Sequence, residues 1–521
     1  MSNLFTINEK LQNALDKIFQ QHRIVFWYDD KAEMTELFEN IQISGVEKLK
    51  IENNEFTLKH KILVEQPKQR FLLYQASAKP VDNENWLLDL LLSNYEFHTE
   101  ASSLFLQELD LPQEFKGLIQ AHEEFFNNQK RVSDLKIFLE KEDRETLIRL
   151  KMICVLCACE PEWEKVLYAL FTEIQKNKQD KYKSIEKFKL SEFLWQTIEK
   201  KYNYKSDKPT IKDFLLNLIH DNFKRSIPGG NPILNKDAYL FVSRWKENNK
   251  ASTLFAEWSK TIETELNIES IVQKINIENL IETDTFSIID KKIIICLRDG
   301  IMKNTLSNFI VQEWFEKRKV KFFYDNYEQL YCSLSYASLL LDEIRKVDLS
   351  INSPETAFQK YEKQWHKIDR IYRKYIVTSS KAEHLDILKE LTLQVEKAYG
   401  NSFLLKLGDN WQKSVDKMEH WKMDKVKSQS EFYSNWIDPY IKSDKRIFVI
   451  ISDAFRYESA SEFREVVMQE DRYSATLNAV LGCLPSYTQL GMASLLPNIS
   501  LTYNDKTDTV FVDGISSQGT P

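Results

Sequence analysis

Hydrophobic and polar positions divide the chain into three stretches of different periodicity. In the first of these, short apolar runs alternate with segments of helical spacing. The predicted strands are 23–28, 46–51, 61–64 and 70–74, and the predicted helices are 8–20, 32–38 and 86–92. Such alternation is typical of a small α/β domain, which we place at residues 1–110.

The second stretch, residues 111–440, has apolar residues at three- and four-residue spacing with Lys and Glu between them. This pattern predicts amphipathic helices almost throughout. The segment 227–232, Ile-Pro-Gly-Gly-Asn-Pro, is the clearest loop and a candidate boundary between two helical subdomains. We find no repeat of fixed period.

The third stretch, residues 441–521, returns to α/β character. Five large apolar residues at 447–451 predict a strand that is buried on both faces, as in parallel sheets. An amphipathic stretch at 459–468 and strand-like runs at 473–477 and 509–513 follow. We therefore expect a small α/β domain, a long helical region and an incomplete C-terminal α/β domain.

Chemistry is predicted mainly in the third stretch. Asp453 would lie at the carboxyl end of the 447–451 strand, where open α/β sheets bind ligands and where a carboxylate can hold a divalent cation. The alternative is a helix N-cap. The turn that begins Leu-Pro-Ser-Tyr-Thr at 484–488 offers Thr488 as a nucleophile, with Ser486 as the competing choice and an N-cap hydroxyl as the structural alternative. We expect Asp453 and Thr488 to face one pocket for a cation and a phosphate.

The runs at 452–458 (Ser-Asp-Ala-Phe-Arg-Tyr-Glu) and 484–497, with the opening at 23–29, resemble the PglZ family of bacterial phage-defence (BREX) proteins. The resemblance implies an alkaline-phosphatase-superfamily domain at 441–521 and a metal-dependent phosphomonoesterase or phosphodiesterase. It also implies Thr488 as catalytic residue and metal ligand, Asp453 as metal ligand, and a two-metal site, with zinc as the expected ion. Arg456 would contact a phosphoryl oxygen, or else pair with Glu458 or Glu462.

The resemblance further implies that additional ligands, histidines among them, follow the nucleophile. Here all eight histidines precede Asp453, and 33 residues follow Thr488. We therefore expect an N-terminal portion of such an enzyme, truncated within its catalytic domain and inactive alone. The alternative is a non-catalytic assembly subunit of the defence complex that binds other BREX subunits through its helical region.

Composition narrows the class of protein. A chain of 521 residues with 43% hydrophobic content should form several well-packed domains. Its net charge of −7 gives no overall attraction to nucleic acid, although a nucleic acid or nucleotide substrate stays possible. We expect no membrane span and no secretory signal, and the six cysteines suggest no disulfide scaffold, so the expected compartment is the cytoplasm.

Weaker candidates have structural alternatives that we favour. The cluster Cys154, Cys157 and Cys159 resembles half of a zinc site but fits a buried helix. The basic cluster Arg370, Arg373 and Lys374, beside Tyr372 and Tyr375, could contact nucleic acid but fits a solvated helix face. Asp29 and Asp30 could bind a metal but fit a solvated helix entry. Nothing in the sequence distinguishes Asp505, Lys506, Asp508 or Asp513 from a solvated loop.

Overall fold

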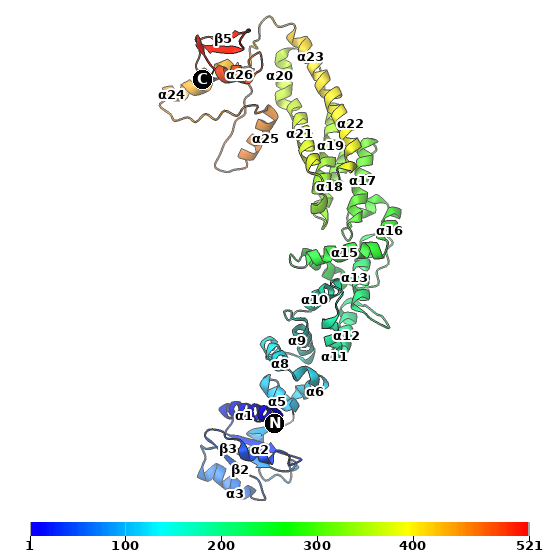
Figure 1. The fold of residues 1–521 in the computed structure, drawn as a ribbon, viewed down its shortest axis with the longest axis vertical. Coiled ribbons are helices and arrows are strands. Elements are labelled where there is room, and N and C mark those ends of the chain that lie inside the picture. Colours follow the sequence, from blue (N-terminus) through cyan, green and yellow to red (C-terminus); the bar gives the residue numbers. More distant parts are fainter. Residues whose placement is uncertain (1, 99–100, 519–521) are drawn as a thin grey trace. The chain divides into compact units, whose positions relative to one another are not determined.

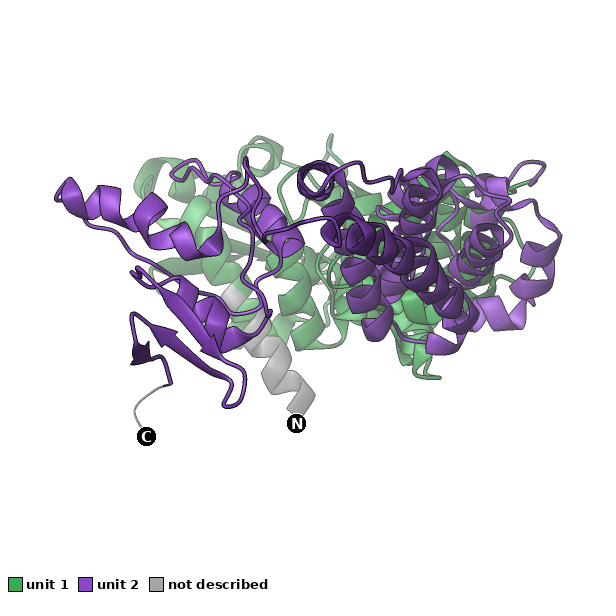
Figure 2. Ribbon diagram, turned by 90° about the horizontal axis from the view of Figure 1, so that it is seen from above, with its two compact units in different colours: residues 1–222, 231–258 green, residues 223–230, 259–521 purple. Residues whose placement is uncertain are grey.

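The computed structural model describes residues 2–98 and 101–518 (Figure 1). The chain forms two compact units, coloured separately in Figure 2. The first comprises residues 1–222 and 231–258, and the second comprises residues 223–230 and 259–521. The domain boundaries given above remain predictions.

The first unit begins with a four-stranded, all-parallel sheet in the order β2-β3-β1-β4. Its elements are α1 (Ser2–Gln21), β1 (Ile24–Tyr28), α2 (Thr35–Asn40), β2 (Val46–Lys50), α3 (Glu55–His60), η1 (Lys61–Glu65), β3 (Arg70–Gln75), α4 (Leu88–Leu92) and β4 (Tyr95–Phe97). Three predicted strands are confirmed, but 61–64 is wrong because this run continues α3 as the π-helical turn η1. A four-residue apolar run does not by itself distinguish strand from helix.

Helices cover both faces of this sheet. Side chains of α1 and α2 pack with Trp27 and Tyr74 on one face. Side chains of α3, η1 and α4 pack with Phe26 and Leu73 on the other face, and Figure 1 shows α3 on the side opposite α1. Successive strand residues point to opposite faces, so alternate residues of β1 and β3 enter different cores. The result is a three-layer α/β arrangement.

The long middle region is helical, as predicted. In the first unit and its borders it contains α5 (Ala101–Glu108), η2 (Gln113–Phe115), α6 (Lys116–Ala121), α7 (Glu123–Phe126), α8 (Gln129–Phe138), α9 (Glu145–Cys157), α10 (Trp163–Gln175), α11 (Asp180–Lys187), α12 (Ser191–Tyr202), α13 (Ile211–Ser226), α14 (Lys236–Glu247) and α15 (Ser252–Glu265). In the second unit it continues with α16 (Ile268–Lys274), η3 (Ile277–Leu280), α17 (Ile288–Met302), α18 (Asn308–Arg318), η4 (Tyr324–Tyr327), α19 (Glu328–Lys346), α20 (Pro354–Lys360), η5 (Tyr361–Trp365), α21 (His366–Lys381), η6 (Leu385–Ile387), α22 (Lys389–Lys397), η7 (Ala398–Leu405) and α23 (Lys406–Val415).

A buried ionic cluster joins three helices of the second unit. Arg318 of α18 donates from Nε and Nη2 to Oδ1 of Asp290 in α17, at 3.0 and 2.6 Å. Tyr331 of α19 donates to the same oxygen at 2.7 Å. Neither the Arg318 nor the Asp290 side chain is exposed to solvent. The pairing compensates two charges that would each be costly to bury alone.

The C-terminal part has little regular structure between its elements. These are η8 (Gln429–Glu431), η9 (Tyr433–Ile437), α24 (Asp438–Lys442), α25 (Tyr457–Val467), α26 (Thr488–Ser494), β5 (Leu501–Asn504), β6 (Thr509–Val512) and β7 (Ile515–Ser516). The strands form one antiparallel sheet, with β6 between β5 and β7. The predicted strand at 509–513 is thus confirmed with a small shift, and most of the amphipathic stretch at 459–468 lies in α25.

Two predicted strands of this part are wrong. Residues 447–451 adopt no strand, and Phe448 and Ile450 are 82% and 92% exposed. Residues 473–477 are also irregular, and Tyr473 is largely exposed. A buried parallel strand needs neighbours for its backbone hydrogen bonds. The strands described in this part pair only with one another, so the apolar run at 447–451 has no sheet to enter.

Candidate functional site

Asp453 lies in an exposed turn before α25. Its Oδ1 accepts a hydrogen bond from the backbone N–H of Ala454 at 2.9 Å. The N-cap position of α25 is occupied by Arg456, in extended conformation, so the N-cap alternative for Asp453 is wrong. The carboxylate therefore stays open to solvent, although it does not follow a strand as predicted.

Glu458, five residues later, is the buried anchor of this motif. Its side chain is 1% exposed, and both of its oxygens accept from Nε of Arg373 in α21, at 3.1 and 2.9 Å. The hydroxyl of Ser459 donates to it at 3.1 Å. A buried carboxylate requires such partners. Helix α25 is thus fixed to α21, which lies beside it in Figure 1.

The basic cluster of α21 forms the other half of this interface. Arg370 donates to both oxygens of Glu465 at 2.8 Å, Lys374 pairs with Glu462 at 2.6 Å, and Arg373 also contacts Glu462. The interpretation as a solvated face is therefore wrong, since each of these basic groups pairs with a carboxylate of α25. Contact with nucleic acid stays a prediction. The alternative pairing of Arg456 with Glu458 or Glu462 is superseded by Arg373. Burial alone would raise the pKa of Glu462, but Lys374 and Arg373 hold that pKa below its ordinary value.

Thr488 is the first residue of α26 and is exposed. The N-cap residue is Tyr487, which makes no side-chain capping hydrogen bond. The N-cap alternative for Thr488 is therefore wrong, and its hydroxyl is not committed to the helix start. Ser486 is also exposed, in the turn just before. Geometry alone does not separate these two hydroxyls.

The hydroxyl turn is supported from two sides. Leu481 exchanges backbone hydrogen bonds with Lys427 and Gln429, and Gln429 Nε2 donates to the carbonyl oxygen of Gly491 at 3.0 Å. On the other side Tyr487 donates to the carbonyl oxygen of Asp508 at 3.2 Å. Apolar residues of α26 pack on Val510 of β6. Thr488 and Asp453 thus depend on different supports, the sheet β5–β7 with segment 427–429 and the helix α21.

The donor set present does not complete a cation site. Among residues 2–98 and 101–518, no group of three or more His, Cys, Asp and Glu is arranged to hold a metal ion. One carboxylate and one hydroxyl, Asp453 and Thr488, fall short of the ligands that a divalent cation takes. Two of the acidic residues downstream serve the β-hairpin instead. Asp508 accepts from Tyr503 at 2.6 Å, and Asp513 accepts from the backbone of Ile499 and Ser500, which lowers the pKa of Asp513.

The weaker candidates take structural places. Cys154 and Cys157 are buried in α9, where burial raises the pKa of Cys157 to about 12, and the left-handed Ala158 ends that helix. Asp29 is 6% exposed and accepts from the backbone N–H of Met34 at 2.7 Å and from Tyr74 at 2.6 Å. Asp29 lies at the entry to α2 as predicted, but its side chain is buried rather than solvated.

One pairing was missed by sequence reasoning, that between the acidic face of α25 and the basic face of α21. Glu458, Glu462 and Glu465 recur at helical spacing, as do their basic partners 370, 373 and 374. Each set was visible as one charged helix face. The pairing of the two faces across about ninety residues could not be predicted, because a charged helix face can equally well be solvated. Separately, no helix within the described ranges is both long and apolar enough to traverse a bilayer.

Comparisons with known proteins agree with the motif resemblance. Residues 432–521 match the family model of the BREX system PglZ alkaline phosphatase-like domain. The chain is 29% identical over 542 residues to the alkaline phosphatase-like protein PglZ of Bacillus cereus (strain H3081.97), covering 99% of this chain and 63% of that protein. It is 28% identical over 552 residues to the alkaline phosphatase-like protein BrxZ of Escherichia coli O9:H4 (strain HS), covering 99% and 64%. No solved structure matches.

The chain therefore spans less than two thirds of the length of each of these relatives. The similarity nonetheless covers its α/β, helical and C-terminal parts alike. The predicted resemblance is confirmed: residues 432–521 match the BREX system PglZ alkaline phosphatase-like domain, and the chain as a whole is similar to PglZ and BrxZ proteins.

Proposed function

We propose that this chain takes part in phosphoryl transfer as the portion of a PglZ-type hydrolase that carries the attacking hydroxyl. Thr488 is assigned as nucleophile, Asp453 as one ligand of a divalent cation, and Arg456 as a contact to the phosphoryl group. The carrying observation is that Thr488, which begins α26, and Asp453, in the turn before α25, are exposed and that neither caps a helix. Polar groups without a structural task, inside a motif of the matched family, are reasonable candidates for chemistry.

In the proposed reaction the hydroxyl oxygen of Thr488 bonds to phosphorus while the bond from phosphorus to the leaving oxygen breaks, and the hydroxyl proton passes to that leaving oxygen. The oxygen of a water molecule then bonds to phosphorus while the bond from phosphorus to the Thr488 oxygen breaks. Phosphate or a monoester leaves, and one proton of the water restores the Thr488 hydroxyl. Arg456, with its guanidinium fork, suits the phosphoryl oxygens. Because the donors described do not complete a cation site, we derive no step through a metal ion.

The test is a chimaera in which this chain is followed by the C-terminal part of the Bacillus cereus relative. Hydrolysis of a chromogenic phosphodiester with Zn²⁺ is measured for the chain alone and for the chimaera. We expect negligible turnover from the chain, measurable turnover from the chimaera, and loss of that turnover in Thr488→Ala. The matched control is Ser486→Ala, whose hydroxyl lies two residues away and is equally exposed. Unchanged activity in Thr488→Ala would refute the assignment.

A second candidate is an assembly subunit that binds other BREX subunits. It is favoured by large apolar side chains exposed on the helical region, including Phe309 at 76% and Val320 at 82%. Single exposed apolar residues are common on protein surfaces, but a helix face that contacts only solvent does not require large apolar side chains. An inactive chimaera that still co-purifies with BREX subunits would favour this role over catalysis.

A further inference from the structure

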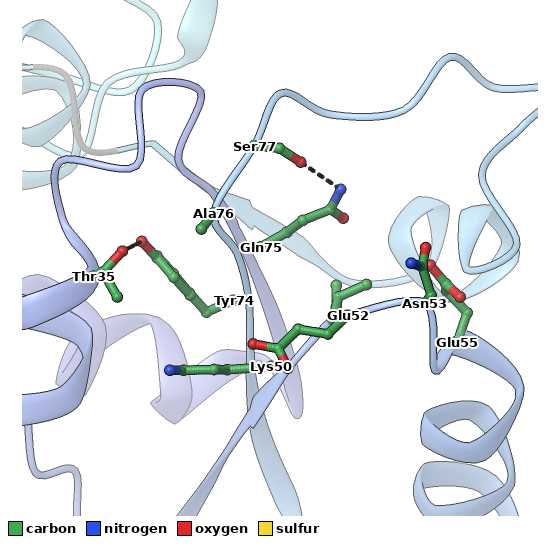
Figure 3. A pocket seen from close by; sticks show the side chains of 10 residues that line it. Thr35, Lys50, Glu52, Asn53, Glu55, Tyr74, Gln75, Ala76 and Ser77 are labelled. Carbon is green, nitrogen blue, oxygen red and sulfur yellow. Dashed lines mark hydrogen bonds between the residues drawn. The ribbon is translucent and has the colours of Figure 1, made fainter.

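A pocket of about 310 Å³ opens at the carboxyl ends of β2 and β3, but its charged side chains do not converge (Figure 3). Glu52 lies beside Lys50, whose ammonium group pairs with Glu39. Glu55 lies apart from them, beside Asn53. These carboxylates therefore offer no common point at which one ligand group could bind, and we assign this pocket no ligand.

The C-terminal end of α9, by contrast, brings two nucleophilic side chains together. The backbone N–H of Cys159 donates to the carbonyl oxygen of Cys154 at 3.1 Å. The backbone N–H of Ala158, which has a left-handed φ of 53°, donates to the carbonyl oxygen of Val155 at 3.2 Å. Two such hydrogen bonds form the Schellman motif, in which the side chains of the first and last residues meet. Here both of these residues are cysteines.

The two thiols differ in exposure and in acidity. Cys154 is 0% exposed, whereas Cys159 is partly exposed. A hydrogen bond from the Cys154 thiol lowers the pKa of Cys159 and raises that of Cys154. Lys181 and Lys165 also lower the pKa of Cys159, and burial and Glu160 oppose this shift without reversing it. The accessible sulfur is therefore the one favoured as thiolate, which is the nucleophilic form of cysteine.

Cys157 differs from both. Its thiol is fully buried, and burial raises its pKa to about 12. The three cysteines together do not form a group that could hold a metal ion. The helix end itself does not require sulfur, because apolar side chains at both ends of a Schellman motif make the same contact. The feature that distinguishes this cap is thus a pair of adjacent thiols, one accessible and one buried.

We propose that Cys154 and Cys159 form a peroxide-sensitive thiol pair, in which Cys159 is oxidised first and Cys154 then closes a reversible disulfide. The sulfur of Cys159 bonds to one oxygen of hydrogen peroxide while the O–O bond breaks, and the departing hydroxide takes up the proton that Cys159 had released. The sulfur of Cys154 then bonds to that of Cys159 while the S–O bond of the sulfenic acid breaks. The hydroxyl group leaves with the Cys154 thiol proton as water.

The two sulfurs together lose two electrons, which reduce one peroxide to two molecules of water. An accessible thiol of lowered pKa beside a second, resolving thiol is the arrangement that redox-sensing cysteines share. The pair lies in α9, outside the C-terminal motifs, and does not depend on the proposed phosphoryl transfer.

The test treats the full chain with hydrogen peroxide and follows each thiol by mass spectrometry. Trypsin releases residues 152–165 as one peptide that contains Cys154, Cys157 and Cys159. Free thiols are first blocked with N-ethylmaleimide in denaturant, disulfides are then reduced, and the released thiols are labelled with iodoacetamide. We expect Cys154 and Cys159 to lose the first label and gain the second, and Cys157 to keep the first.

The parent chain contains its own reference thiols. Cys296 and Cys332 are partly exposed like Cys159, but burial raises the pKa of each. Both should therefore be oxidised more slowly than Cys159. This comparison needs no substitution, so it tests the pair even where a variant of a buried cysteine does not fold.

Three serine variants separate the roles of the thiols. Cys154→Ser should leave Cys159 as a sulfenic acid that dimedone traps, and Cys159→Ser should leave Cys154 reduced. Cys157→Ser, which removes a buried thiol of the same helix, is the matched control and should still form the disulfide. The proposal is overturned if Cys157 joins the disulfide, if the pair reacts no faster than Cys296 and Cys332, or if dithiothreitol does not restore both thiols.

Discussion

Replacing Arg373 by alanine tests whether α21 holds the Asp453 motif in place. The change removes both hydrogen bonds from Nε to Glu458 and the contact to Glu462. Glu458, 1% exposed, would keep only the hydroxyl of Ser459 as a partner. An uncompensated buried carboxylate is costly, so α25 should detach from α21 rather than keep the charge buried.

The magnitude follows from the exposure of the two partners. Breaking a fully buried pair from one side costs about 3–5 kcal/mol, and an exposed pair is worth about 1 kcal/mol or less. Glu458 is buried but Arg373 is 37% exposed, so water screens part of the interaction. We therefore expect Arg373→Ala to lower the free energy of opening α25 by about 2–3 kcal/mol, which lies between those limits.

Hydrogen exchange with mass spectrometry measures this directly. Amides of Tyr457–Val467 should exchange about 30- to 150-fold faster in Arg373→Ala, since each 1.4 kcal/mol corresponds to a factor of ten. Lys374→Ala, which removes a neighbouring and more exposed pair with Glu462, is the matched control and should change exchange much less. Adding Glu458→Gln to Arg373→Ala should recover part of the protection. Equal exchange in the two single variants would refute the role of Arg373 as anchor.

Two further predictions concern the second unit. Because the pKa of Glu462 is held below its ordinary value of 4.5, the folded state binds protons less readily than the unfolded state there. The docking of α25 should therefore be fully present above that value and weaken as pH falls through the lower, folded-state pKa, visible as faster exchange at acid pH after correction for intrinsic rates. Arg318→Leu should lower the free energy of unfolding by about 3–5 kcal/mol, because Asp290 would remain buried without its cation, and denaturant titration would check this. A loss under about 1 kcal/mol would contradict the importance of that pair.

The relation between periodicity and structure explains which sequence predictions held. Helical spacing depends on residues three and four apart, so the middle region was predictable from the chain itself. The strands β1, β2 and β3 were predictable for the same reason. The structure of the run at 447–451 was not predictable. An apolar segment indicates only that its side chains favour burial, and whether a neighbouring strand buries them depends on residues far away in the sequence. The motifs around Asp453 and Thr488 were recognised from the order of their residues in the sequence alone, and the family match agrees with this recognition.

The sequence by itself determined the helical content, three of the strands near the N-terminus and the resemblance of the C-terminal part to the PglZ domain. Tertiary structure decided which charged face meets which: Glu458 finds Arg373 only because α25 folds back onto α21. It also decided that the ends of β2 and β3 share one pocket, since strand order cannot be deduced from strand positions. The physical reason is common to both. Secondary structure follows from neighbours along the chain, whereas burial and ion pairing depend on groups that the sequence separates by tens of residues.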